Sequence, residues 1–481
     1  MNPHRRRYLD ELLKNQLWQS LNFGAKAAFL VLLTPLMMAR WGAEGFGLFA
    51  LASSLLVSMS LLDGGVRSLT RLRLAQAIRD SDDREFCRAY SEGLFTFASV
   101  VVLACLASAA LAATGELGRW LHLAGGGEWV LVLTVILSGI LMVTLLALEP
   151  LAAQGRLSEL KSANTWGAAI AIPLVAILVW AGCSVAAAIA AYSLCLIVPN
   201  LLLAAKEKLF RHQPWRVIPS PGTILRTLRS GIWYYLTTVA LVGKTHALTF
   251  LVSGMAGPAE AGIFYVLLRI SEMVGNVGAT ASETSLAALA AAPAPADRKQ
   301  CFVQSWRYAA LFCLHGAAVL GFLGDDLVHL WLAGADILPH GTGWALALFG
   351  LSGALSRVVV NAAMGLEIVR SAALANIVEA LADILLAAVG YRYAGLAGLF
   401  VGGSVGMVVL AGPARSIARL AGSSAWGLYA RPLGILLRGV GPAGLALALA
   451  GTLSWPGWWF GALALAGAIG LLQLRELHRQ G

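Results

Sequence analysis

The chain has 481 residues, of which 58% are hydrophobic and only 12% are charged. Soluble domains carry about 25% charged residues, so this composition excludes an ordinary soluble protein. The formal net charge of +10 would suggest a nucleic-acid partner in a soluble protein. In so apolar a chain we expect no nucleic-acid partner, because basic residues at the ends of membrane spans serve to orient the chain.

Apolar segments of about 20 residues recur along the chain, each long enough to cross about 30 Å of hydrocarbon as a helix. They are continuous and lack the alternation of a membrane β-barrel strand. The sequence therefore predicts an all-α polytopic membrane protein with about 14 transmembrane helices. In chain order we expect the spans at residues 17–39, 47–66, 91–113, 128–148, 163–181, 185–204, 231–253, 262–290, 305–324, 342–365, 372–390, 395–412, 434–453 and 456–474.

The positions of the basic residues predict the orientation of the chain. Lys and Arg accumulate in the short cytoplasmic loops of membrane proteins. If the N-terminus is inside, 27 of the 35 Lys and Arg residues fall in cytoplasmic segments, and only Arg40, Arg119 and Arg392 fall in outer ones. Both termini are therefore predicted to be cytoplasmic.

Two motifs occur twice at nearly the same offset. Gly42–Phe49 and Gly257–Phe264 each consist of a glycine, four residues, a glycine, a branched aliphatic residue and a phenylalanine. Asp83–Cys87 and Asp297–Cys301 share a second pattern. The common offset favours duplication of a six-span unit, and an even number of spans gives both copies the same orientation, as in transporters with a parallel repeat.

The repeat divides the chain into two six-helix lobes around a central cavity, followed by an appended helix pair. Leucines at helical spacing among charges near the N-terminus predict a short amphipathic helix on the inner membrane surface. The expected domains are this helix at 1–16, an N-lobe at 17–210, a cytoplasmic linker at 211–230, a C-lobe at 231–412, and spans 13 and 14 with the tail at 413–481.

The segments Arg40–Phe49, Leu61–Gly65 and Arg67–Arg88 together resemble the start of the Wzx-type polysaccharide flippases. These belong to the multidrug, oligosaccharidyl-lipid and polysaccharide exporter superfamily. The resemblance covers the first two spans well, the seventh and eighth moderately, and the rest only through topology and length. Many of these flippases have twelve spans, so the two additional spans expected here depart from the usual number. In this respect the chain is similar to the related lipid II flippase and to fourteen-span exopolysaccharide members.

The resemblance implies a transporter that flips a polyprenyl-pyrophosphate-linked oligosaccharide by alternating access, for O-antigen, capsule or exopolysaccharide assembly. It also implies the bacterial inner membrane as the location. Membrane lipids, a polysaccharide polymerase and glycosyltransferases of the same pathway are the implied partners.

Ionisable residues inside spans cost about 2.5 to 3.5 kcal/mol on insertion scales, and they usually face a cavity or each other. In span eight Arg269, Glu272, Asn276, Thr280 and Glu283 share one helix face, which predicts a hydrophilic cavity wall. The alternative is that Arg269 and Glu272, three residues apart, simply neutralise each other.

Other spans carry smaller polar faces. Span one contains Asn22 and Lys26, and Lys26 either faces the cavity or reaches the inner interface along its flexible stem. Lys244 in span seven is too deep for that, which favours a cavity role. Arg357 in span ten and the acidic residues of span eleven could equally form a structural salt bridge between helices.

We assign these residues to two tasks. The candidates for binding the pyrophosphate and glycan are Lys26, Asn22, Lys244, Arg269, Asn276 and Arg357. The candidates for carrying a coupling ion, H⁺ or Na⁺, are Glu272, Glu283, Glu379 and Asp383. We expect no cofactor, metal site or disulfide framework, since the six cysteines show no CxxC spacing.

Two other functions compete with the flippase. An ion-coupled multidrug antiporter would share the two-lobe plan but should bind cationic drugs at acidic residues. A membrane-embedded glycan polymerase or ligase should carry reactive groups in an outer loop, and the outer loop contains Asp325, Asp326, His329, Asp336 and His340.

An enzyme is not expected. The sequence Gly402–Gly406 fits the serine-hydrolase elbow, but it lies on a ladder of glycines in span twelve, which is typical of close helix packing.

Overall fold

The structure is a computed structural model of the chain. It describes residues 3–59, 66–123, 125–154, 156–209, 220–291, 313–326, 341–366 and 369–406, with residues 302, 306, 328–329, 409 and 417. Over these residues the fold is nearly all helical and contains no strand, which confirms the predicted all-α membrane protein. The expected spans 13 and 14 lie outside the described residues.

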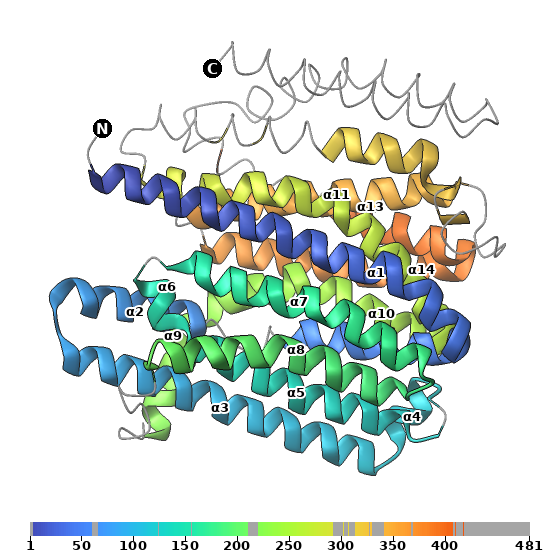
Figure 1. The fold of residues 1–481 in the computed structure, drawn as a ribbon. Coiled ribbons are helices and arrows are strands. Elements are labelled where there is room, and N and C mark those ends of the chain that lie inside the picture. Colours follow the sequence, from blue (N-terminus) through green and yellow to red (C-terminus); the bar gives the residue numbers. More distant parts are fainter. Residues whose placement is uncertain are drawn as a thin grey trace. The chain divides into compact units, whose positions relative to one another are not determined.

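The described residues form a succession of helices (Figure 1). The first part of the chain forms α1 (Pro3–Ser58), α2 (Val66–Asp80), α3 (Asp83–Ala113), α4 (Glu116–Trp120), α5 (Gly127–Ala147), α6 (Glu149–Ala153), α7 (Leu157–Trp180) and α8 (Val185–Lys206). The second part forms α9 (Pro221–Thr238), a π-helix (Val239–Gly243), α10 (Lys244–Ala256), α11 (Pro258–Ala291), α13 (Thr342–Gly365) and α14 (Val369–Val405). Residues 313–326 are also helical.

Eight stretches of the described residues are long and apolar enough to cross a membrane. Two of them contain a sharp bend where two successive spans were expected. α1 bends at Gly42, with φ of 70°, and α14 bends at Gly395, with φ of 58°. This left-handed backbone is accessible to glycine without strain, so the turns between spans one and two and between spans eleven and twelve are confirmed.

Helix ends differ from the expected domain limits at two places. α1 begins at Pro3 and continues without a break into span one, so residues 3–16 are not a separate helix. α9 begins at Pro221, so half of the expected linker 211–230 already belongs to the helix of span seven. The physical reason is that backbone hydrogen bonding continues past the point where the side chains cease to be apolar.

The chain forms two compact units. The first contains Met1–Tyr235 and Thr249–Ile263, and the second contains Leu236–Leu248 and Phe264–Gly481. The first unit therefore includes, besides the expected N-lobe, the expected linker, the expected C-lobe residues up to Tyr235, and Thr249–Ile263, which comprises most of α10 and the start of α11. The limits of the compact units thus differ from the expected limits of the lobes at these segments.

In the first unit α1 packs along α7, α7 along α8, α8 along α5, and α5 along α3 (Figure 1). Small residues permit this close packing. A Cβ added to Gly167 would lie 2.4 Å from the carbonyl oxygen of Cys195 on the neighbouring helix. Apolar side chains such as Leu141 and Ile197 fill the space between α5, α7 and α8.

The two repeated motifs share one backbone feature. The first glycine of each motif, Gly42 and Gly257, lies between two spans with a positive φ of 70° and 93°. Only glycine takes this conformation at little cost, so both copies need glycine for the same turn. This shared requirement supports the predicted duplication.

The second glycines of the motifs lie in one close contact within the first unit. A Cβ on Gly47 would fall 1.7 Å from the backbone oxygen of Pro258. A Cβ on Gly262 would fall 3.1 Å from Cα of Gly47. The backbones of α1 and α11 can therefore approach here only because both residues lack side chains.

The basic helix α2 is held by two buried carboxylates. Glu149 is fully buried and accepts hydrogen bonds from Arg67 and Arg71, the latter with Nε 2.6 Å from Oε2. Glu92 accepts from Arg73 at 3.0 Å and also from an arginine one turn before it on α3, at 2.9 Å. Each carboxylate thus binds two guanidinium groups and joins α2 to its neighbours.

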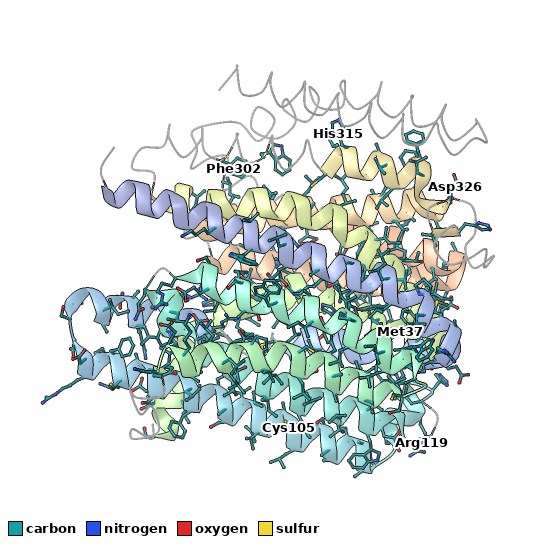
Figure 2. All side chains as sticks on the ribbon, in the orientation of Figure 1. Met37, Cys105, Arg119, Phe302, His315 and Asp326 are labelled. Atoms are coloured by element: carbon teal, nitrogen blue, oxygen red, sulfur yellow. The ribbon has the colours of Figure 1, made fainter. Side chains whose placement is uncertain are left out.

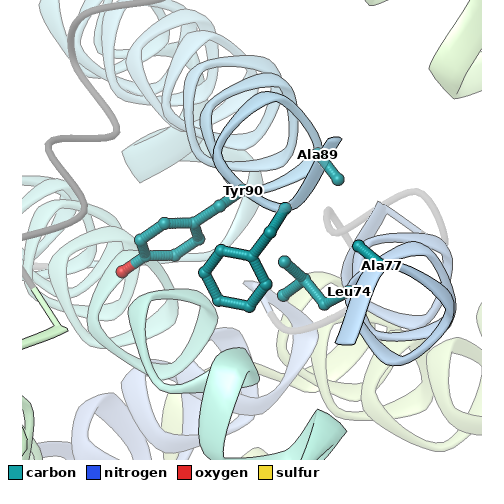
Figure 3. Packing of buried hydrophobic residues seen from close by; sticks show 5 residues of the cluster. Leu74, Ala77, Ala89 and Tyr90 are labelled. Atoms are coloured by element: carbon teal, nitrogen blue, oxygen red, sulfur yellow. The ribbon is translucent and has the colours of Figure 1, made fainter. Parts of the chain in front are cut away.

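An apolar contact completes this attachment. Leu74 and Ala77 of α2 pack against Ala89 and Tyr90 of α3 (Figure 3). The Tyr90 hydroxyl donates a 2.9 Å hydrogen bond to the backbone oxygen of Ala147 at the end of α5. Its polar tip is therefore satisfied inside the apolar cluster.

In the second unit α13 packs along α14, and the two arms of α14 fold back on each other. The glycines of the ladder allow this: a Cβ on Gly402 would lie 2.2 Å from the backbone oxygen of Leu386, and one on Gly398 would lie 2.1 Å from that of Gly390. The buried Ser404 hydroxyl donates to the oxygen of Phe400 at 2.6 Å. The prediction that this sequence is a packing motif is confirmed.

Candidate functional site

The second unit contains two clusters of charged side chains within its helices. In the first, the ammonium group of Lys244 lies between two carboxylates of α14. Its Nζ is 2.8 Å from Oε1 of Glu379 and 2.6 Å from Oδ2 of Asp383. All three side chains are at least 94% buried. Since desolvating each charge costs several kcal/mol, mutual pairing is what permits them here.

Local helix geometry brings these three residues together. Glu379 and Asp383 are four residues apart on α14, so they lie one above the other on the same face. Lys244 is the first residue after the π-helix Val239–Gly243. A π-helix has a wider turn than an α-helix and therefore changes the direction of the side chains that follow it. The π-helix packs against α14, and the next side chain is directed at the acidic pair.

Neighbouring groups complete the acidic cluster. The Ser356 hydroxyl donates to Glu379 at 2.7 Å, and the backbone N–H of Gly406 donates to Asp383 at 2.8 Å. One turn before Glu379, the Asn376 amide donates to the oxygen of Thr237 at 3.0 Å. Four helices, α9, α10, α13 and α14, together with the residue that follows α14, thus contribute to one site.

Two acceptor atoms of this cluster remain unused. Oε2 of Glu379 and Oδ1 of Asn376 are buried and have no hydrogen-bond partner among the described residues. Buried acceptors are nearly always satisfied, so this pair needs an explanation. The two carboxylates carry two negative charges and the ammonium group of Lys244 carries one positive charge, so the cluster has a net charge of minus one. A proton or a small monovalent cation would satisfy both conditions.

The second cluster lies on α10, α11 and α13. Nη1 of Arg269 lies 2.6 Å from Oε2 of Glu272, and its guanidinium lies 4.8 Å above the centre of the Tyr265 ring. Such a cation–π contact further stabilises a desolvated guanidinium. The Arg269 side chain is 22% exposed, whereas Glu272 is 9% exposed. The alternative in which these two residues pair is therefore what the structure shows, with Arg269 the more accessible partner.

His246 and Arg357 belong to the same cluster. The His246 side chain is buried, and the charges of Arg269, Glu272 and Arg357 all act on its ring.

The other predicted site residues are in different places. Asn22 and Lys26 lie on α1 in the first unit, where Lys26 is exposed and Asn22 is half-buried. Oδ1 of Asn22 is buried without a hydrogen-bond partner in the part of the chain that the structure describes. Asn276 and Glu283 lie in α11, but their side chains are outside the described residues.

The sequence predictions therefore divide in an unexpected way. Lys244, assigned to pyrophosphate, is paired with two residues assigned to ion coupling, Glu379 and Asp383. Glu272, assigned to ion coupling, is paired with Arg269, assigned to pyrophosphate. His246 was not assigned a role from the sequence. The only sequence feature that could have indicated its place in the second cluster is its position two residues after Lys244, on a different face of the helix.

The acidic segment that was expected to form an outer loop has a structural role at Asp325, which lies at the end of the helical segment 313–326. The Asp325 carboxylate accepts hydrogen bonds of 2.7 Å from the backbone N–H groups of Gly341 and Gly343. These groups lie at the start of α13, where helical N–H groups lack partners and favour a negative charge. Asp326 follows at the end of the helical segment 313–326 (Figure 2). Asp336 and His340 lie outside the described residues.

No protein family and no curated protein matches the sequence. Similar solved structures do exist. The lipid II flippase MurJ in an inward closed conformation has a TM-score of 0.73 at 12% identity, covering 96% of this chain and 99% of that one. An inward-facing multidrug resistance MATE family transporter of the MOP superfamily has a TM-score of 0.67 at 17% identity, covering 82% and 95%.

The chain has the fold of these membrane proteins. A eukaryotic MATE transporter, AtDTX14, has a TM-score of 0.56 at 15% identity, covering 89% of this chain and 99% of that one. The chain is therefore a multi-pass membrane protein whose fold is shared by drug transporters and a lipid flippase. What it carries must be argued from its own residues.

Proposed function

We propose that this protein flips a polyprenyl-pyrophosphate-linked oligosaccharide across the bacterial inner membrane by alternating access, for the assembly of a surface polysaccharide. The fold supports transport of a lipid-linked head group, since a lipid II flippase has it. The observation that carries the proposal is Arg269, an arginine in the helix of span eight that is paired with Glu272 yet remains 22% exposed.

The chemistry of the head group fits this cluster. A pyrophosphate diester carries two negative charges on oxygens that accept paired hydrogen bonds from a guanidinium group. Arg269 is the more exposed member of its ion pair, so it has donors to offer to an incoming anion. The lipid tail stays in the bilayer, and uncharged polar side chains contact the glycan. Lys26, Asn22 and Asn276 are further proposed contacts for the substrate.

We assign ion coupling to the cluster of Lys244, Glu379 and Asp383. Its surplus negative charge and its two unused acceptors suit H⁺ or Na⁺. In this assignment Lys244 is a fixed counter-ion of the acidic pair and does not hold the pyrophosphate. Coupling follows if loading of the cation changes the packing of α10 against α14.

A multidrug antiporter is the second candidate, because MATE transporters share the fold and because the acidic pair could bind a cationic drug. Lys244 occupies the space between the two carboxylates, so a cationic drug would have to displace it. The observed ion pairs therefore favour a small coupling ion at this site.

The test is a flipping assay with purified protein in lipid vesicles that contain a fluorescent polyprenyl-pyrophosphoryl sugar. Arg269→Ala should reduce the flipping rate at least about tenfold, and Arg269→Lys should retain part of it, since it keeps the charge but loses the paired donors. Arg119→Ala is the matched control, because Arg119 is exposed and pairs only with the exposed Glu116 among the described residues.

Two outcomes would contradict the proposal. Unchanged flipping by Arg269→Ala would remove the anion role of this cluster. Absence of flipping by the unaltered protein, together with ion-driven export of a fluorescent lipophilic cation from the same vesicles, would favour the multidrug antiporter.

A further inference from the structure

A charged cluster of the first unit, near the beginning of α3, combines one carboxylate with two guanidinium groups. Oε2 of Glu92 accepts a 3.0 Å hydrogen bond from Nη1 of Arg73 on α2. Oε1 of the same carboxylate accepts a 2.9 Å hydrogen bond from Nε of Arg88, one turn earlier on α3. One negative charge thus faces two positive charges, and the cluster keeps a net charge of plus one.

The two guanidinium groups are accessible, whereas the carboxylate between them is not. The side chain of Glu92 is 8% exposed, against 32% for Arg73 and 61% for Arg88. Each arginine binds Glu92 through a single nitrogen, and a guanidinium group has five N–H donors. Most of these donors have no partner among the described residues. Glu92 therefore holds two guanidinium groups close together, with donors available to a second anion on the exposed side.

Other charged groups nearby do not cancel this positive charge. Arg84 and Glu85, about one turn before Arg88 on α3, have opposite charges. On α2, Arg67 and Arg71 share a single carboxylate in the same way, so no excess of negative charge lies there. The acidic residues in and beside the turn between α2 and α3 are all exposed, namely Asp80, Asp82 and Asp83. Water and salt weaken the effect of such exposed charges.

The face of α3 that carries Arg88 is exposed along the predicted span. Val102, Leu103 and Leu106 are 56%, 66% and 63% exposed. The helix is continuous over Asp83–Ala113, and Leu106 follows Arg88 by about five full turns, so the two lie on the same face. Val102 and Leu103 lie within about 60° of that face. In a membrane protein, such exposed apolar side chains contact lipid tails.

Arg88 lies at the level expected for lipid head groups. The predicted span begins at residue 91, and the arginines that precede it predict that this end of α3 faces the cytoplasm. One helix face thus carries a guanidinium group at the head-group level and apolar side chains along the hydrocarbon. Basic residues clustered at this level are typical of sites for anionic lipid head groups.

The geometry points to a binding site for an anionic phospholipid, in which Arg73 and Arg88 bind the phosphodiester and the acyl chains lie along the exposed face of α3. A phosphodiester carries one negative charge, which matches the charge of the cluster, and its oxygens accept paired hydrogen bonds from guanidinium groups. A zwitterionic phospholipid has the same phosphate, but its own ammonium group cancels the charge. None of these residues is assigned to the transported substrate, so the site does not depend on the proposed function.

Photo-crosslinking tests the site. The full chain is reconstituted in phosphatidylcholine vesicles with a small amount of phosphatidylglycerol that carries a photoreactive group in one acyl chain, and mass spectrometry identifies the labelled peptides. A phosphatidylcholine probe with the same acyl chain is the reference. In the unaltered protein, the phosphatidylglycerol probe should label the first half of α3 about tenfold more than the reference does, because the cluster selects the net charge of the head group.

The variant Arg88→Gln removes the more exposed guanidinium group and the net positive charge, while Arg73 still pairs with Glu92. The two probes should then label α3 about equally. Arg88→Lys should retain part of the preference, since it keeps the charge but loses the paired donors. Arg119→Gln is the control, because Arg119 is also exposed but forms a one-to-one pair with Glu116. It should leave the preference unchanged.

Equal labelling by the two probes in the unaltered protein, or an unchanged preference in Arg88→Gln, would overturn the proposal. Stronger displacement of the probe by a farnesyl-pyrophosphoryl sugar than by unlabelled phosphatidylglycerol would assign the site to the transported lipid instead. If Arg88→Gln does not fold, competition in the unaltered protein decides. Unlabelled phosphatidylglycerol should displace the probe from α3, and displacement by inorganic phosphate would show a site for a free anion and refute the lipid assignment.

Discussion

The ammonium nitrogen of Lys244 lies 2.6 Å from a carboxylate oxygen of Asp383, although the two residues are 139 positions apart in the chain. The contact joins the helix of span seven to that of span eleven inside the second unit. Because a second carboxylate, Glu379, binds the same ammonium group, removal of the lysine leaves two buried negative charges without their counter-ion.

The variant Lys244→Met should therefore lower the free energy of unfolding by about 3 to 5 kcal/mol, the usual cost of breaking a buried ion pair from one side. Thermal unfolding in detergent measures the effect. The triple variant with Glu379→Gln and Asp383→Asn removes the stranded charges and should recover most of the loss. A Lys244→Met protein as stable as the unaltered one would show that the cluster is not the charged triad described above.

Under the proposed function, the variant Glu379→Gln should abolish the dependence of flipping on the coupling ion. The amide keeps the shape of the side chain, but it removes the negative charge that attracts a cation to the unused acceptor. Flipping is measured in vesicles with and without a pH gradient and, separately, with and without a Na⁺ gradient. An unchanged response to both gradients would exclude this residue as the coupling site.

The variant Gly47→Ala should destabilise the protein by about 1 to 3 kcal/mol or more, because the added methyl group would overlap the backbone oxygen of Pro258. Backbone atoms, unlike the end of a flexible side chain, cannot move aside cheaply. Gly24→Ala in the same helix is the control, since no atom lies within 4 Å of the new Cβ. It should be neutral or stabilising by about 0.5 to 1 kcal/mol. Equal thermal stability of the two variants would contradict the close contact.

The variant Glu149→Gln should loosen α2, because Arg67 and Arg71 lose their common buried acceptor charge. Limited trypsin digestion measures this directly, since cleavage after these arginines requires local opening of the helix. Glu116→Gln is the control, as its ion pair with Arg119 is exposed and contributes about 0 to 1 kcal/mol. Unchanged digestion of α2 in Glu149→Gln would refute its attachment through this carboxylate.

The membrane-spanning architecture could be predicted from the sequence because it depends on local properties. A helix of about 20 apolar residues satisfies its own backbone hydrogen bonds in lipid, whatever its neighbours are. The bends at Gly42 and Gly395 were also predictable, since a turn with left-handed backbone requires glycine or a similar residue. The glycines spaced four residues apart around Gly402 indicated close packing for a local reason too, because a helix face without side chains lets another backbone approach.

The pairing of Lys244 could not be predicted in this way. Helical periodicity gives the face on which Lys244 lies, but not the helix that this face meets. The pair of Arg269 and Glu272, three residues apart on one helix, was a possibility that the sequence already offered. The π-helix before Lys244 changes the direction of the side chains that follow, and no period of 3.6 residues reveals it.

The sequence by itself thus determined the membrane class, most of the spans, the internal repeat and the set of charged residues inside the bilayer. Only the tertiary structure decided that Lys244 pairs with Glu379 and Asp383, and that of the two possibilities left open for Arg269 it pairs with Glu272. For Lys244 the reason is that an ion pair between helices depends on distances of a few ångströms between segments far apart in the chain, and those distances follow from packing.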